Sequence, residues 1–183
     1  DYRQYLSKWF GAPEVSLDSL TGTHEYGSSI FAKFLSENHK KWGNDDVDII
    51  KSIWEKCRTT SSLAAINQVL ISSYSSTIAT AFSSFTAWNY DNSKLQTAKY
   101  YEPKYQGVYY SSAAVADTYD TGILYVNGTL PHLSSKYIVI PPDNYNYKAK
   151  AMYFQLFNNS TIWGAKLLQI DKWGYIGGTG NDR

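Results

Sequence analysis

The chain has 183 residues, of which 43% are hydrophobic and 16% aromatic, so it can bury the core of one domain or of two small ones. Its formal net charge of +1 excludes nucleic acid as a main partner, because phosphate binding needs a basic surface. A lone cysteine, Cys57, excludes an internal disulfide, and no apolar run approaches the roughly 20 residues of a membrane span.

Helical periodicity runs through residues 1–92. A first helix with an apolar face ends at Gly11 and Pro13, and a second begins after Thr21 to Thr23 and stops at Gly43. Asn44-Asp45-Asp46 predicts the start of a third, and Thr59 to Ser62 and Ser75 or Ser76 predict the caps of two more. The inward face of the helix after Asp46 is expected to carry Val47, Ile50, Ile53, Trp54 and Cys57. We expect four or five helices packed around Phe31, Phe34, Ile50, Ile53, Trp54, Leu70, Phe82 and Phe85.

After Asp91 the long helical periodicity gives way to short β-prone runs separated by turn residues. These runs are 107–110, 123–126, 137–140, 149–157 and 163–170. Because the turns are short, we expect antiparallel pairing. The predicted fold class is therefore α+β: an N-terminal helical bundle (1–92) followed by a C-terminal antiparallel β module (93–176), with a flexible tail at 177–183.

Candidate chemistry is sparse. His24-Glu25 suggests the start of a zinc-binding helix, but that motif needs a second histidine four residues on, where this chain has Ser28. We therefore expect no metal and no cofactor in this chain, and we place His24 and Glu25 in the first turn of a helix. Cys57 is expected to be a buried small hydrophobic residue. The sequence holds no recognisable catalytic set.

The polar, uncharged composition favours an extracellular or cell-surface setting. Asn-x-Ser/Thr triplets make Asn127, Asn158 and Asn159 candidates for glycosylation. The chain opens on Asp1, which suggests a processed or excised form. The aromatic side chains of the β half offer either ordinary strand packing or a platform for stacking on sugars: Tyr100, Tyr101, Tyr105, Tyr109, Tyr110, Trp163 and Trp173.

Three segments carry a resemblance to a known family. They are Tyr26-Gly27-x-x-Ile30-Phe31-x-x-Phe34-Leu35, Ile49-Ile50-x-x-Ile53-Trp54-Glu55 and Phe82-x-x-Phe85-x-x-Trp88-Asn89-Tyr90. Together they resemble the part that follows the zinc-binding helices in a family of secreted bacterial and archaeal zinc metalloproteases of the gluzincin type. The resemblance covers roughly residues 1–145.

The resemblance implies a non-catalytic C-terminal portion of a metalloprotease-like protein, whose HExxH helix and glutamate ligand belong to an upstream segment. That segment is then the main partner, and zinc belongs to the full-length parent. Tyr26 and His24 are weak candidates for stabilising the oxyanion, beside the alternative that Tyr26 is a core anchor. A second function stays open: an extracellular binding or assembly module that binds peptide or glycan, or self-associates, through a Tyr-rich β surface.

Overall fold

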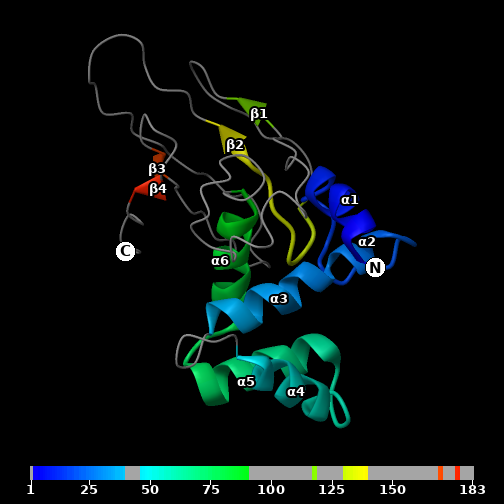
Figure 1. The fold of residues 1–183 in the computed structure, drawn as a ribbon, viewed down its shortest axis with the longest axis vertical. Helices are drawn as coiled ribbons and strands as arrows, with labels where there is room; N and C mark the ends of the chain where they lie inside the picture. The colour runs from blue at the N-terminus through cyan, green and yellow to red at the C-terminus, as the bar shows by residue number, and fades with distance from the viewer. Residues whose placement is uncertain are drawn as a thin grey trace.

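The structure is a computed structural model that describes residues 2–39, 46–90, 117–118, 130–139, 169–170 and 176–177. Within this part the first half is helical. Its elements are η1 (Tyr2–Tyr5), α1 (Leu6–Gly11), α2 (His24–Gly27), α3 (Ser29–Asn38), α4 (Val47–Lys56), α5 (Ser62–Tyr74) and α6 (Ile78–Tyr90). The α4 and α5 helices pack side by side at one end of the molecule, α3 lies between them and the N-terminal helices, and α6 leads away towards β2 (Figure 1).

Of two polar helix caps, the one at α4 lies where the sequence predicts it and the one at α6 does not. The Asp46 carboxylate accepts a hydrogen bond from the Asp48 backbone N–H at 3.1 Å and so caps α4 as predicted. The α6 helix is capped one or two residues later than expected, because the Thr77 hydroxyl oxygen accepts from the Thr80 N–H at 3.2 Å. The side-chain carbonyl of Asn67 on α5 accepts from the Ile78 N–H at 2.9 Å, so α5 also helps to fix where α6 begins.

The core lies where α1, α3, α4, α5 and α6 meet. Phe31, Phe34, Leu70 and Phe85 are buried in it as predicted, while Ile50, Ile53 and Phe82 are partly buried and pack against it. The aromatic rings contact one another in edge-on and tilted pairs, which adds specificity to the apolar burial.

Two hydrophobic residues of α4 that were predicted to face the core are exposed. Trp54 is 73% exposed and Val47 is 69% exposed, so the predicted inward face of α4 is wrong at both positions. Ile49 is the fully buried residue of that helix. Tyr26 is 52% exposed and is not a core anchor.

The helix predicted after Thr23 is divided at Ser28 into α2 and α3. Gly27, at the end of α2, packs closely against α1. A Cβ at Gly27 would lie 2.7 Å from Trp9 Cβ and 3.0 Å from the Tyr5 carbonyl oxygen, so a glycine is needed for α2 to approach α1 this closely. The single helix predicted from after Thr23 to Gly43 therefore does not form, and α3 ends at Asn38.

The predicted antiparallel β module is wrong, since the described part of the chain is mostly helical. Its strands are two residues long: β1 (Asp117–Thr118) and β2 (Ile138–Val139) form one pair, and β3 (Gln169–Ile170) and β4 (Ile176–Gly177) form another. The first pair is parallel, with Asp117 opposite Ile138, and only the second is antiparallel. Residues 119–137 separate β1 from β2, which is long enough for the crossover that parallel strands require. The predicted runs 107–110, 123–126 and 149–157 lie outside the described residues.

Residues 130–139, which we call the return segment, lie against the N-terminal part of the chain. The Leu17 N–H donates to the Leu133 carbonyl at 3.0 Å, and the Ser135 N–H donates to the Pro13 carbonyl at 2.8 Å. The Tyr137 hydroxyl donates to the Thr86 carbonyl of α6 at 2.9 Å. The return segment therefore joins the loop after α1 to α6.

Candidate functional site

His24 is the buried polar residue of α2. Its side chain is 4% exposed, and its ring lies 4.4 Å from the ring of Trp9. Burial lowers the pKa of His24 below 6.5, and the charge of Glu25, a hydrogen bond with the Ser16 backbone and the charge of Glu14 oppose that shift. The imidazole is therefore neutral at pH 7, and its Nε2 atom is buried with no hydrogen-bond partner.

Glu25 and Tyr26 follow His24 on α2, but the three side chains do not line one cavity. The Tyr26 ring stacks on Tyr5 at 4.8 Å and is half exposed, whereas His24 is covered by Trp9. The Oε2 atom of Glu25 is buried and, like Nε2 of His24, has no hydrogen-bond partner. Buried polar atoms without partners are rare in folded proteins, so two of them on consecutive residues mark α2 as a candidate site of interaction.

A zinc ion does not fit the described residues. Among them no three His, Cys, Asp or Glu side chains are placed to hold a metal ion. On α2 the position one turn after His24 is Ser28, whose hydroxyl donates to the Glu25 carbonyl at 2.7 Å. Metal chemistry is accordingly not assigned to any residue of this part of the chain.

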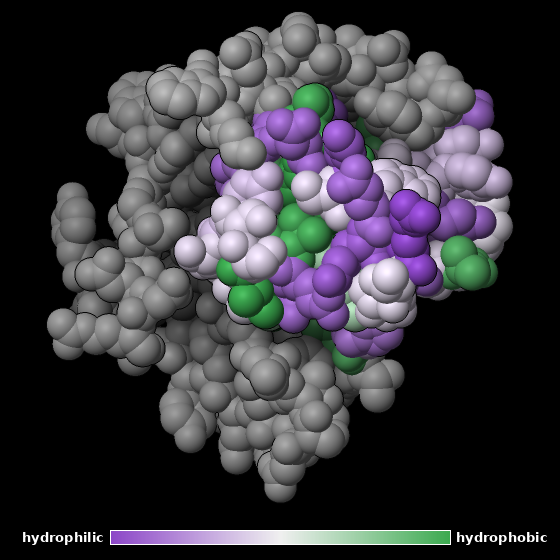
Figure 2. Space-filling model, turned by 90° about the horizontal axis from the view of Figure 1, so that it is seen from below, coloured by the Kyte–Doolittle hydropathy of each residue, from purple (hydrophilic) through white to green (hydrophobic). Residues whose placement is uncertain are grey.

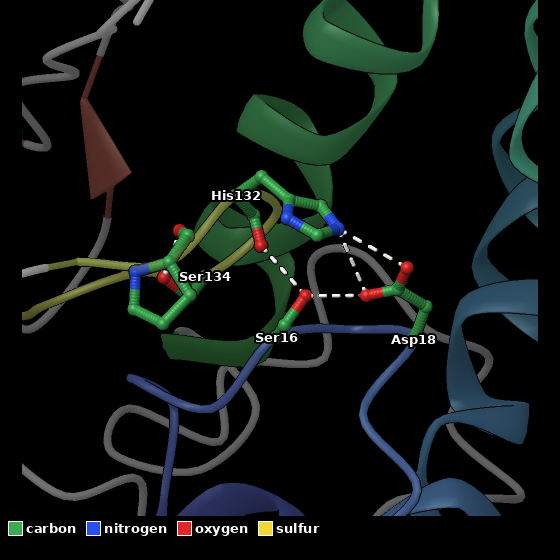
Figure 3. A network of polar contacts seen from close by, with 5 residues as sticks. Ser16, Asp18, His132 and Ser134 are labelled. Atoms are coloured by element: carbon green, nitrogen blue, oxygen red, sulfur yellow. Dashed lines mark hydrogen bonds and ion pairs between the residues drawn. The ribbon is translucent and has the colours of Figure 1, made fainter.

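A second polar cluster joins Ser16 and Asp18 to His132 of the return segment (Figure 3). The Ser16 hydroxyl lies 2.5 Å from Asp18 Oδ1 and 2.8 Å from the His132 carbonyl oxygen. His132 Nε2 lies 3.1 Å from Asp18 Oδ2 and 3.0 Å from Oδ1. The sequence analysis missed this cluster, and no local signal could have found it, because the partners are more than a hundred residues apart.

The three residue types are those of a hydrolase triad, but their order differs. In a triad the histidine lies between serine and carboxylate, where it can remove the serine proton. Here the carboxylate of Asp18 lies between the other two. The Ser16 hydrogen bond, together with His132, lowers the pKa of Asp18 below 3.8 against the opposing effect of burial, so Asp18 is a weak base. The cluster therefore fastens the return segment to residues 16–18 and does not activate a nucleophile.

Leu133 adds backbone strain at the same place. Its φ is +47°, a left-handed conformation that is costly for a branched side chain. The hydrogen bond from the Leu17 N–H and the packing of the Leu133 side chain on the core hold it there.

The cavity beneath the return segment is too small for a substrate. Its volume is about 10 Å³, which is room for about one water molecule. Ser135 and Tyr137 of the return segment close it from one side, above the aromatic residues Trp9, Phe82 and Phe85.

A third polar group lies where α3, α4 and α5 meet. The Tyr74 hydroxyl donates to Asp46 Oδ2 at 2.7 Å, and the His39 ring lies 4.6 Å from the Tyr74 ring. Burial lowers the pKa of His39 below 6.5, with the charge of Asp46 opposing. This group connects three helices and caps one of them, which is a structural role.

Cys57 at the end of α4 is half-buried, less covered than predicted.

Comparison with protein families, curated proteins and solved structures found no match. No helix among the described residues is long and apolar enough to span a membrane. The glycosylation candidates Asn127, Asn158 and Asn159 lie outside the described residues. So do the aromatic residues proposed as a sugar platform: Tyr100, Tyr101, Tyr105, Tyr109, Tyr110, Trp163 and Trp173.

Proposed function

We propose that this chain is a non-catalytic C-terminal portion of a secreted zinc-metalloprotease-like protein. In this proposal residues 1–92 form a helical wall beside the catalytic segment. The HExxH helix, which this sequence does not contain, belongs to that other segment.

The observation that carries the proposal is that the three segments of the resemblance meet in one packing unit. Phe31 and Phe34 come from the first segment and Phe85 and Trp88 from the third. The Phe31 and Phe85 rings are 5.0 Å apart, the Phe34 and Phe85 rings 5.4 Å, and the Phe34 and Trp88 rings 5.0 Å. The second segment supplies Ile49, which is fully buried in the same core.

In this proposal the α2 helix contacts the upstream segment. Nε2 of His24 and Oε2 of Glu25 are buried and unpartnered, so a neighbouring segment would reach them with a donor or acceptor once the side chains that cover them move aside. Of the two weak catalytic candidates, only Tyr26 is exposed enough to contact a substrate, since His24 is covered. In this proposal Tyr26 faces the cleft and His24 positions α2.

The test is a polypeptide in which residues 1–183 follow their own upstream coding sequence. We expect an HExxH motif within roughly 100 preceding residues. The longer protein should bind one zinc ion and cleave an unstructured protein such as casein. Changing the glutamate of that motif to Gln should abolish cleavage while zinc remains bound.

The 183-residue chain serves as the control, with metal content measured on the purified protein. Stoichiometric zinc in this shorter chain would contradict the assignment of the metal to the upstream segment. An upstream sequence without any HExxH motif would remove the basis of the metalloprotease proposal.

A further inference from the structure

The return segment contacts the rest of the chain in the way that an extended peptide contacts its receptor. In Figure 1 it runs, in yellow, between α1 and α6. The Leu133 carbonyl accepts a hydrogen bond from the Leu17 N–H at 3.0 Å. The Ser135 N–H donates to the Pro13 carbonyl at 2.8 Å, and the Tyr137 hydroxyl donates to α6 at 2.9 Å. Contacts from alternate residues, with backbone hydrogen bonds among them, are typical of extended peptides bound to a protein.

Two side chains of the return segment anchor it on the core. Leu133 and Tyr137 both pack against the core, and the Tyr137 ring lies 5.2 Å from the Tyr90 ring. Between these anchors the small residue Ser135 lines the cavity of about 10 Å³, together with Trp9. The return segment therefore fills its place incompletely at the centre, where less contact is made than in a close-packed core.

The fastening of the return segment is weak near its start. The ion pair between Asp18 and His132 (Figure 3) is exposed on both sides, so it contributes little free energy. The left-handed φ of Leu133 is costly, and this cost is relieved when the segment leaves. Both features lower the free energy that is needed to lift the return segment from the helices.

The surface under the return segment differs from the other apolar surface of the described chain in having a visible occupant. In the view onto the α4–α5 end, hydrophobic areas interrupt a mainly hydrophilic surface (Figure 2), and Trp54 and Ile71 are exposed on these two helices. Neither side chain indicates what a partner there would be. The surface beside α1 and α6 is seen with a stretch of polypeptide on it, and that stretch defines the chemistry that the surface accepts.

We propose that residues 13–18, α1 and α6 form a binding site for an extended peptide, and that the return segment occupies this site as an internal, displaceable ligand. The peptide carries a leucine-like residue at the position of Leu133 and a tyrosine four positions later. A histidine before the leucine-like residue pairs with Asp18. The site needs neither zinc nor an upstream segment, so it is independent of the function proposed above.

An internal ligand makes the site harder to reach for a separate peptide. If a fraction of the molecules is open, the apparent dissociation constant of the separate peptide equals its intrinsic constant divided by that fraction. A substitution that weakens the contacts of the return segment itself therefore raises the affinity for the separate peptide. A substitution in the surface beneath the segment lowers that affinity.

The probe is a fluorescein-labelled peptide of residues 130–139, and fluorescence anisotropy measures its binding to the whole chain. Tyr137→Ser removes the aromatic anchor from the chain but not from the peptide, so this variant should bind the peptide at least about tenfold more tightly than wild type. His132→Ala removes only the exposed ion pair, and we expect a gain of about two- to fivefold. The matched control is Ile71→Ser on α5, which should bind the peptide like wild type.

Two controls show whether the peptide occupies the same surface. A peptide in which Leu133 and Tyr137 are both replaced by Ser should not bind. Val15→Glu places a charge in the lining of the cavity and should abolish binding when added to either variant of the return segment. Circular dichroism checks that each variant keeps its helices, and the exposed His132 gives a folded variant if Tyr137→Ser unfolds. Equal affinity in wild type and His132→Ala, no binding to the folded variants, or binding that survives Val15→Glu overturns the proposal.

Discussion

Replacing Phe85 by Ala tests the core on which both the fold and the proposed function depend. Phe85 is 0% exposed, and its ring lies 5.0 Å from Phe31, 5.4 Å from Phe34, 5.8 Å from Phe82 and 5.9 Å from Trp9. Truncating a buried phenylalanine costs about 3–5 kcal/mol through lost transfer energy and the cavity that remains. That range already includes the lost ring contacts, and because Phe85 has four aromatic partners we expect a loss at its upper end, about 4–5 kcal/mol.

Urea unfolding followed by far-UV circular dichroism measures the loss, and Trp54→Ala is the matched control. Trp54 is larger than Phe85 but 73% exposed, so its truncation should change the free energy of unfolding by less than about 1 kcal/mol. Equal losses for the two variants, or a loss below about 1.5 kcal/mol for Phe85→Ala, would refute the packing described for α6.

The polar groups give three further predictions. Asp46→Ala removes the α4 cap and the acceptor of a buried hydroxyl, so it should cost about 2–4 kcal/mol in urea unfolding; a neutral result would contradict that role. Because burial lowers the pKa of His24 and His39 below 6.5, the unfolded chain binds protons first, and stability should fall as the pH drops below 6.5. Unfolding midpoints from pH 7.5 to 5.5 should lose most of this slope in a double His→Gln variant, and an unchanged slope would assign it to other groups. Asp18→Asn should cost less than about 1 kcal/mol, since its ion pair with His132 is 40% and 62% exposed, and a larger loss in urea unfolding would show that the cluster does more than fasten a surface segment.

The helices could be predicted because caps and apolar spacing, the signals of a helix, lie within a few residues of one another in the sequence. The α4 cap at Asp46 and the buried positions of α3 follow from side-chain spacing within one or two turns. Trp54 shows the limit of this reasoning, since periodicity gives an apolar face but does not say how much of that face the same chain covers.

The features that the sequence did not predict depend on contacts between residues far apart in the chain. The close packing of Gly27 on Trp9 is one such contact, which periodicity within a helix does not contain. The parallel pairing of β1 with β2 could not be predicted either, because a short turn permits antiparallel pairing of two strands but does not require that pairing. For the candidate site, the sequence placed His24 in a first turn, as observed, but its burial against Trp9 could not be predicted.

The return segment has a consequence for the order in which the chain folds. Its contacts with residues 13–18 join parts of the chain more than a hundred residues apart, whereas α3 to α6 pack largely against neighbours in sequence. Non-local contacts form late, because the loop they close must first lose its conformational entropy. We therefore expect the helical unit to assemble first and the return segment to dock beside α1 and α6 last. If the same contacts open first in the native state, the amide hydrogens of the return segment should exchange ahead of those of the helical core.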